Sequence, residues 1–347
     1  MRRSTVSEGS AVARWLRSRY GQRPIRAIAQ DIASEFLTAA KETRPPIDPA
    51  SILALRRVRP YRLVTGARAE LMTKDGRLSV AQDGFRLEVR AGPKTRTRFT
   101  LAHELGHTIF YDLDSSPPRR MLHGEAPRDE ESFCNLVASE ILMPADMVGP
   151  HIQKHHPKDI GASPITTIVG LAEVFKVSAG AMARRLVEDL EVLDGIALGC
   201  RWLPKVASSN NSTPLGWAWR LSWWAASPAV IGPLYLPAAS RRPRVGLMAL
   251  EEAYLHRAGL GVEIDLKSIS LGNLRKILSE EAGERATAHV WVHPILPSGI
   301  QLRSRSSEGQ APEDPAVLVR QASEVIAFFP LGVYRSAVAP EPGRPLE

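Results

Sequence analysis

The sequence predicts an α+β protein in which a helical segment separates two mixed regions. Apolar residues recur at three- and four-residue steps over residues 24–41, as on the buried face of an amphipathic helix. Apolar and polar residues alternate over residues 85–90, which is typical of a half-buried strand. After Gly199 the chain becomes rich in Trp, Pro and Ser and carries short β-type runs. With 347 residues and 44% apolar content, the chain is long enough for two or three domains.

The first region is expected to span residues 21–155. Residues 1–20 are polar and arginine-rich, which predicts a flexible leader before it. Asp48 and Pro49 suit the cap and the first turn of a short helix. The expected elements are helices over 24–41, 48–58, 98–111 and 128–142 and strands over 61–64, 69–73 and 85–90.

A helix-turn-helix-like unit is expected over residues 156–198. Two short helical patterns there flank residues 176–178, and Ser178 can cap the second helix. Residues 199–336 are expected to form a separate α+β domain, followed by a Pro-rich, disordered tail over 337–347. The expected elements of that domain are strands over 229–236, 288–293 and 325–334 and a helix over 270–281.

Charge and cysteine content narrow the function classes. The net charge of +8 is spread along the chain, so it supports DNA binding only weakly. Cys134 and Cys200 are too few for a disulfide scaffold, which favours a reducing compartment. The sequence shows neither a secretory signal nor an apolar run of about 18 residues. We therefore expect a cytoplasmic protein with no membrane partner.

The residues that point most directly to chemistry are His103, Glu104 and His107, which lie in an apolar, helix-forming stretch. Histidines four apart on a helix share one face, where both can bind one Zn²⁺ ion. Glu104 projects beside them, where its carboxylate can take a proton from a water molecule held by the metal. Zinc lowers the pKa of such a water from 15.7 towards about 7. Alternatively, such a pattern can be a buried helix with a satisfied histidine pair.

A third ligand is expected because catalytic zinc sites usually have three protein ligands and one open position. Glu131 and Asn135 are four apart on the helix expected over 128–142 and share a stripe apart from its apolar side. That stripe could face the metal, with Glu131 as a ligand and Asn135 orienting it or a neighbouring group. The other interpretation is an acidic first turn favoured by the helix dipole, which we adopt for Asp129 and Glu130.

Residues 96–107 and 131–144 resemble the two motifs of the ImmA/IrrE metallopeptidase family, and the resemblance covers about residues 45–145. It implies a zincin-like metallopeptidase domain with a small sheet and active-site helices. It further implies a metallo-endopeptidase that uses Zn²⁺, with Mn²⁺ as another activating metal. By position in the motifs, the metal ligands fall on His103, His107 and Glu131, and the general base falls on Glu104.

The family resemblance extends to architecture and substrate. In longer members, a peptidase domain, a helix-turn-helix-like unit and a sensor-like domain of GAF type follow one another, and this chain looks similar. The family cleaves helix-turn-helix transcriptional repressors, which implies such a repressor as the protein substrate and a stress or mobile-element response as the outcome. The alternative is a non-catalytic regulator that binds DNA or a repressor through residues 163–195 and uses zinc structurally.

Several residues depart from the family pattern or stay open. Cys134 stands where the family commonly has alanine, and we expect a small buried thiol rather than a redox sensor. Tyr111 and Asp112 replace a histidine, which leaves the oxyanion-stabilising residue open. Arg96 and Arg98 either contact substrate or solvate the end of a strand. Surface positions are expected for His123, His151, His155 and His156, and a small aromatic core or a stacking surface for Trp217, Trp219, Trp223 and Trp224.

Overall fold

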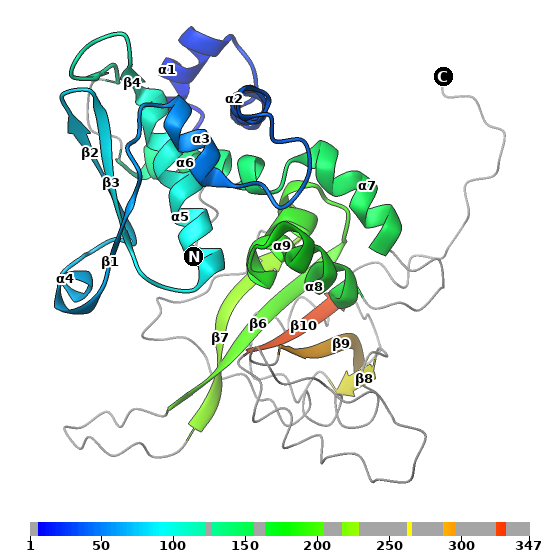
Figure 1. Cartoon of the computed structure of the whole chain (residues 1–347). Coiled ribbons are helices and arrows are strands. Elements are labelled where there is room, and N and C mark those ends of the chain that lie inside the picture. Colours follow the sequence, from blue (N-terminus) through cyan, green and yellow to red (C-terminus); the bar gives the residue numbers. More distant parts are fainter. Residues whose placement is uncertain are drawn as a thin grey trace, which may run out of the picture. The chain divides into compact units, whose positions relative to one another are not determined.

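The computed structural model describes residues 6–122, 127–155, 164–204, 217–228, 262–265, 287–295 and 324–330 (Figure 1). The chain divides into two compact units. The first comprises Met1–Pro157 and Thr167–Arg185, and the second comprises Lys158–Thr166 and Leu186–Glu347. The helical unit expected over 156–198 is thus divided between them.

Three helices open the first unit: α1 (Ala11–Tyr20), α2 (Ile25–Ala40) and α3 (Pro49–Leu55). The prediction of a flexible leader is wrong for α1. This arginine-rich segment also has an apolar face, on which Val12 and Leu16 are fully buried. The Ser10 hydroxyl caps the helix by accepting a hydrogen bond from the Ala13 backbone N–H at 3.1 Å. The α2 helix buries the predicted face, and α3 begins at the predicted Asp48 cap, which accepts from the Ala50 N–H at 3.1 Å.

A three-stranded sheet follows, in the order β1-β3-β2. Its strands are β1 (Arg62–Val64), β2 (Gly76–Ala81) and β3 (Gly84–Arg90), and β3 runs parallel to β1 and antiparallel to β2. The predicted alternation of β3 is confirmed, since Phe85, Leu87 and Val89 are at most 2% exposed. The strand predicted over 69–73 is wrong. This part of the chain forms the end of the short helix α4 (Gly66–Glu70) and a turn, because its alanine-rich sequence favours helix.

Two packed helices form the centre of the first unit. They are α5 (Lys94–His107), which continues into the 3₁₀ turn η1 (Thr108–Phe110), and α6 (Pro127–Leu142). The helices lie side by side (Figure 1). Gly106 permits this approach, because a Cβ there would lie 3.0 Å from the Cα of Cys134. Cys134 is fully buried, as predicted, and burial raises the pKa of its thiol well above the ordinary value.

Short elements connect and follow this helix pair. The two-residue strands β4 (Tyr111–Asp112) and β5 (Arg119–Arg120) pair antiparallel between α5 and α6. After α6 come α7 (Ala145–His155), α8 (Pro164–Phe175), α9 (Ala179–Arg184) and a π-helical turn η2 (Arg185–Asp189). As predicted, Ser178 caps α9, accepting from the Ala181 N–H at 3.2 Å.

Arg185 is fully buried and forms hydrogen bonds with two parts of the first unit. Its guanidinium forms a bidentate pair with Glu140 of α6, with N–O distances of 2.6 and 2.5 Å. Its Nε donates to the Met143 carbonyl at 3.0 Å. This arginine therefore holds the end of α9 to α6.

No single helix among the described residues is long and apolar enough to span a bilayer. The bent pair Pro164–Phe175 and Ala179–Asp189, with an angle of 116° between its helices, would be so by length and composition alone.

The second unit contains a five-stranded antiparallel sheet in the order β7-β6-β10-β9-β8. Its strands are β6 (Gly195–Pro204), β7 (Trp217–Ala226), β8 (Val262–Asp265), β9 (Thr287–Ile295) and β10 (Glu324–Pro330). Trp224 is 8% exposed and Trp223 covers the backbone of Gly199, which favours the aromatic-core interpretation. The elements expected over 229–236 and 270–281 and the tail over 337–347 lie outside the described residues.

Candidate metal centre

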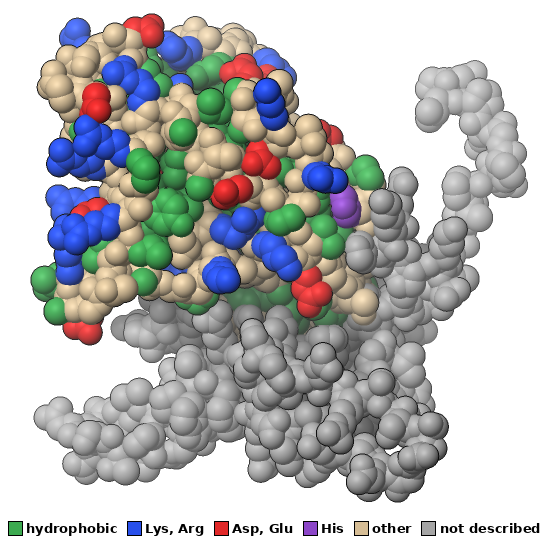
Figure 2. Space-filling view, viewed as in Figure 1, with side chains coloured by type: hydrophobic (Ala, Val, Ile, Leu, Met, Phe, Trp, Pro, Cys, Tyr) green, Lys and Arg blue, Asp and Glu red, His purple; other side chains and the backbone are tan. Residues whose placement is uncertain are grey.

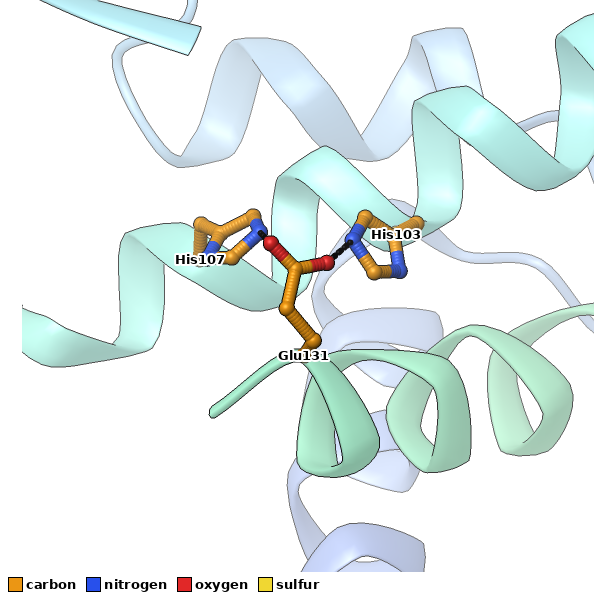
Figure 3. Close-up of side chains that lie close together, drawn as sticks. All are labelled: His103, His107 and Glu131. Carbon is orange, nitrogen blue, oxygen red and sulfur yellow. Dashed lines mark hydrogen bonds and ion pairs between the residues drawn. The ribbon is translucent and has the colours of Figure 1, made fainter. Parts of the chain in front are cut away.

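The two histidines of α5 and a carboxylate of α6 converge at one point (Figure 3). His103 Nε2 lies 3.0 Å from Glu131 Oε2, and His107 Nε2 lies 3.8 Å from Glu131 Oε1. The spacing of four residues puts both imidazoles on the same side of α5, with ring centroids 5.0 Å apart. The structure thus brings together the three residues that the sequence predicts as ligands.

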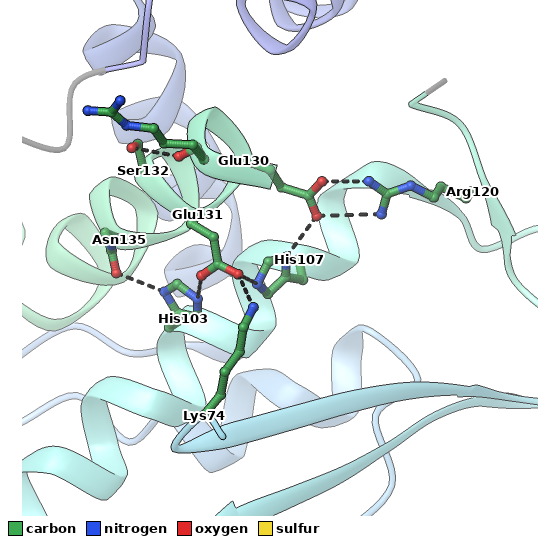
Figure 4. Close-up of polar contacts among 9 residues, drawn as sticks. Lys74, His103, His107, Arg120, Glu130, Glu131, Ser132 and Asn135 are labelled. Carbon is green, nitrogen blue, oxygen red and sulfur yellow. Dashed lines mark hydrogen bonds and ion pairs between the residues drawn. The ribbon is translucent and has the colours of Figure 1, made fainter. Parts of the chain in front are cut away.

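The Nδ1 atoms of both histidines face oxygen atoms on α6 (Figure 4). His103 Nδ1 lies 2.9 Å from Asn135 Oδ1, and His107 Nδ1 lies 2.8 Å from Glu130 Oε1. An oxygen acceptor at Nδ1 accepts a hydrogen bond from that nitrogen, so Nε2 of each ring faces Glu131. In a neutral imidazole the Nε2 lone pair can then bind a shared metal ion. Without a metal ion, Nε2 of His103 can carry a second proton and donate it in the hydrogen bond to Glu131.

Glu130 lies in the acidic first turn of α6, as predicted, and has a second role there. It is 7% exposed, and its Oε1 lies 2.8 Å from His107 Nδ1. Its other oxygen accepts from Arg120 Nη2 at 2.5 Å. Burial alone would raise the pKa of Glu130, but the hydrogen bonds from His107 and Arg120 outweigh it and lower that pKa below its ordinary value.

Glu131 is held ionised by its surroundings. The hydrogen bond from His103 is the main cause that lowers its pKa to about 2; burial opposes this, and a hydrogen bond from Lys74 adds to it. Lys74, in the turn before β2, places its Nζ 2.5 Å from Glu131 Oε1. A cation is therefore already accommodated beside this carboxylate.

Glu104 lies on the sheet-facing side of the same helix. It is 6% exposed, and burial raises the pKa of its carboxyl, against the opposing influence of His107 and His103. It packs against the backbone of Gly76, where a Cβ would lie only 2.3 Å from Glu104 Oε1. Because Gly76 has no side chain, the start of β2 can lie directly against this carboxylate.

The donor set fits a zinc ion. The candidate ligand atoms of His103, His107 and Glu131 all lie within 4.8 Å of one another. Tetrahedral zinc with bonds of about 2.0–2.2 Å needs ligand atoms roughly 3.3–3.6 Å apart, so small side-chain rotations suffice. Two imidazoles and one carboxylate are also the ligand types of zinc sites that keep a fourth position open.

Sequence reasoning missed Lys74, Gly76, Glu130 and Arg120. Of these residues, only Glu130 could have been found from the sequence, because it is adjacent to Glu131. Two adjacent carboxylates on one helix point about 100° apart and can reach two different histidines. Lys74 and Gly76 arrive from a separate strand, which no local spacing indicates.

The remaining polar candidates that the structure describes have hydrogen-bond or ion-pair partners within the first unit. Arg96 pairs with Asp75 at 2.5 Å, and Arg98 donates to the carbonyls of Ile47 and Lys176 at 2.5 and 3.2 Å. The prediction of a surface position is wrong for His151, which is partly buried and donates from Nδ1 to the Met147 carbonyl at 2.8 Å. His123 and His156 and the side chain of His155 lie outside the described residues.

The part of the chain that carries this centre is similar to known proteins. Residues 77–187 match the family model described as IrrE N-terminal-like domain, Peptidase_M78, and this range contains the two histidines and Glu131. The chain is 28% identical over 169 residues to the "Radiation response metalloprotease IrrE" of Deinococcus radiodurans. That match covers 46% of this chain and 49% of the relative, so it spans about half the length of the relative.

A solved structure, a Mycobacterium tuberculosis transcriptional regulator, shows 12% identity over 92% of this chain and 93% of its own, with a TM-score of 0.40. The family-model match covers the region that carries the converging histidines and carboxylate. Residues 77–187 are thus similar to the IrrE N-terminal-like domain, which supports the resemblance of this chain to the ImmA/IrrE family.

Proposed function

We propose that the chain is a zinc-dependent endopeptidase that cleaves a helix-turn-helix transcriptional repressor and thereby induces a stress or mobile-element response. The observation that carries the proposal is the convergence of both histidine Nε2 atoms on Glu131, with the buried carboxylate of Glu104 on the adjacent position of α5. The repressor as substrate rests on the family resemblance alone.

Each residue of the centre has a separate role in the proposed reaction. His103, His107 and Glu131 would hold the ion, which when bound polarises the scissile carbonyl and acidifies a water molecule. Glu104 accepts the proton of the attacking water and passes it to the leaving amine. Its raised pKa suits this exchange, because a base whose pKa lies closer to neutrality both takes and returns a proton readily. Asn135 and Glu130 hold the imidazole rings of His103 and His107 in a fixed orientation through hydrogen bonds.

The test is cleavage of a defined repressor. Purified full-length protein with zinc or manganese is incubated with the helix-turn-helix repressor encoded nearest to it in the genome, and the fragments are identified by mass spectrometry. We expect a single cut. The Glu104→Gln protein should retain bound metal but cut about 10²–10⁴-fold more slowly, because only the proton acceptor is lost.

The matched control is Glu35→Gln, which makes the same chemical change at an exposed position of α2. It should cut at the parent rate. If Glu104→Gln also cuts at the parent rate, the assigned base is wrong.

The second candidate is a non-catalytic regulator that binds DNA through α8 and α9. The bend of 116° between these helices is within the roughly 90–120° range of helix-turn-helix units. Against it, Arg185, which directly follows α9, is fully buried against Glu140 and is therefore not available to contact DNA. Salt-dependent, sequence-specific binding of the repressor's operator DNA by the full chain, with no cleavage of the repressor, would favour this candidate.

A further inference from the structure

Lys74 brings a positive charge to the candidate metal centre from outside the helix pair. It lies in the turn before β2, and its Nζ is 2.5 Å from Glu131 Oε1. Its side chain extends from the start of β2 towards Glu131 and ends beside the imidazoles of His103 and His107 (Figure 4). Because a carboxylate ligand lies about 2 Å from its zinc ion, this ammonium lies within about 5 Å of an ion held by Glu131.

Two other cations of this region are paired with carboxylates that are not proposed ligands. Arg120 pairs with Glu130 at 2.5 Å, and Arg96 pairs with Asp75 at 2.5 Å. Lys74, by contrast, contacts a proposed ligand itself. It is therefore the cation best placed to act on a group that reacts at the centre.

The ammonium of Lys74 keeps donors available. Its side chain is 68% exposed, so it lies on the solvent side of the centre, where a substrate can approach. Among the residues that the structure describes, only Glu131 accepts a hydrogen bond from it. Since an ammonium has three N–H donors, two remain for another acceptor.

The backbone on both sides of Lys74 is held by the protein itself. The Met72 carbonyl accepts from the Arg90 guanidinium, and the Asp75 carbonyl accepts from the Arg90 N–H at 2.7 Å. The Asp75 carboxylate is bound by Arg96 at 2.5 Å. The turn is thus formed before any substrate binds, so little reorganisation is needed to place the charge.

The same turn leads directly to the proposed general base. Gly76, two residues after Lys74, lies against Glu104, where a Cβ would be 2.3 Å from Oε1. One short segment therefore contacts both a proposed ligand, Glu131, and the proposed base. The reacting carbonyl group would lie between these two parts of the centre.

Peptide hydrolysis creates a negative charge that needs such a cation. When the water oxygen bonds to the carbonyl carbon, the water proton goes to Glu104 and the π electrons move onto the carbonyl oxygen. A donor placed where this charge develops lowers the barrier, because it binds the transition state more tightly than the substrate. The sequence left this role open, since Tyr111 and Asp112 stand where the family often has a histidine.

We propose that Lys74 is a catalytic residue that donates a hydrogen bond to the oxyanion formed from the scissile carbonyl. The proposal rests on the proposed peptidase function, because it assigns Lys74 to a step of that reaction. It predicts that the ammonium binds a tetrahedral anion at the centre, which can be measured without any peptide.

The first experiment is therefore the binding of a small tetrahedral anion. Zinc-loaded, full-length protein is titrated calorimetrically with methylphosphonate, which resembles the charged tetrahedral group that water addition creates. Lys74→Gln should bind it about tenfold more weakly, which corresponds to about 1.4 kcal/mol. Lys74→Arg should bind it within about threefold of the parent, because the positive charge and the donors remain.

Zinc affinity, measured by chelator competition, separates this role from a structural one. In Lys74→Gln it should equal or exceed that of the parent, because the substitution removes a positive charge beside the ion. A lower zinc affinity would mean that Lys74 only supports Glu131, and it would overturn the proposal.

Cleavage of the repressor gives a third measurement. Lys74→Gln should lower kcat about 10²-fold and leave KM within about twofold, because the oxyanion exists in the transition state and not in the bound substrate. Lys74→Arg should recover most of the lost rate. A higher KM at the parent kcat would assign Lys74 to substrate binding and overturn the catalytic role.

The control has to account for anion binding elsewhere, because exposed Lys and Arg side chains occur over much of the visible face of the first unit (Figure 2). Lys94→Gln makes the same change at the exposed first residue of α5. It should bind methylphosphonate as the parent does.

The outcomes separate the two proposals. No methylphosphonate binding by the parent, equal binding by the parent and Lys74→Gln, or an equal loss in Lys74→Gln and Lys94→Gln overturns the role of Lys74. If the parent cuts its repressor and Lys74→Gln cuts it equally fast, only the role of Lys74 fails. If methylphosphonate binding depends on Lys74 but nothing is cut, only the peptidase function fails.

Discussion

Replacing Gly76 by alanine tests whether Glu104, the proposed general base, is positioned by the strand beside it. A Cβ at this position would lie 2.3 Å from Glu104 Oε1, 2.7 Å from Thr100 Cγ2 and 2.8 Å from Glu104 Cδ. Ordinary contact begins near 3.4 Å, so the carboxylate oxygen must move by at least 1.1 Å or β2 must retreat from α5. Because Glu104 is only 6% exposed, it has little free space into which to move.

The expected loss follows from that displacement. A shift of about 1 Å in a catalytic group costs roughly 10²-fold in rate, and overpacking of a tight site costs about 1–3 kcal/mol of stability. The three atoms nearest the new methyl group belong to Glu104 and Thr100 rather than to the imidazoles, so zinc content should stay at the parent level. Single-turnover cleavage of the repressor, bound zinc and the denaturation midpoint measure the three quantities separately.

Gly92→Ala is the matched control, because no atom lies within 4 Å of a Cβ at that position. It should cut at the parent rate. Combining Gly76→Ala with Glu104→Asp, which withdraws the carboxylate by one methylene, should cost less than the two single losses together. If Gly76→Ala retains zinc and cuts as fast as Gly92→Ala, the contact between β2 and Glu104 does not position the base.

Three further variants examine the surroundings of the centre. Glu130→Gln weakens the hydrogen bond that orients His107, so zinc affinity measured by chelator competition should fall about 10–100-fold. An unchanged zinc affinity would show that this hydrogen bond does not support metal binding. In the metal-free protein, the hydrogen bond from His103 holds the pKa of Glu131 at about 2, below its ordinary 4.5. The ionised Glu131 therefore stabilises the fold above pH 4.5, and this contribution, about 1–2 kcal/mol after screening, is lost as the pH falls towards 2. Glu131→Gln should flatten this part of the denaturation–pH curve, and an unaltered slope would refute the assignment. Glu140→Gln leaves the buried guanidinium of Arg185 without its counter-charge, so unfolding free energy should fall by about 3–5 kcal/mol, and an unshifted urea midpoint would count against it.

The parts predicted from the sequence are those that local periodicity determines. The apolar stripe of α2, the Asp48 cap of α3 and the Ser178 cap of α9 all depend on residues within one or two turns. The convergence of the three proposed ligands could also be predicted from the sequence. His103 and His107 share a face by spacing, and Glu131 lies on a second helix whose apolar side fixes which stripe faces α5.

The parts that were missed depend on contacts between distant segments. Lys74 reaches Glu131 across 57 residues, and the carboxylate of Glu104 meets the backbone of Gly76 only after β2 has paired with β3. The burial of Glu130 likewise depends on Arg120, which comes from the short β4–β5 hairpin. The prediction of a strand over residues 69–73 failed for a local reason. A short apolar run does not by itself distinguish a strand from one turn of helix.

The hydrogen bonds of Arg98 set the size of the smallest recombinant fragment that can keep this centre intact. This side chain leaves α5 one turn before His103 and donates to the backbone at Ile47 and, beyond the second motif, at Lys176. A protein truncated after Pro144, where the recognisable motifs end, would keep every proposed ligand yet remove an anchor of the helix that presents two of them. A fragment of this chain trimmed for crystallisation should therefore extend past Arg185.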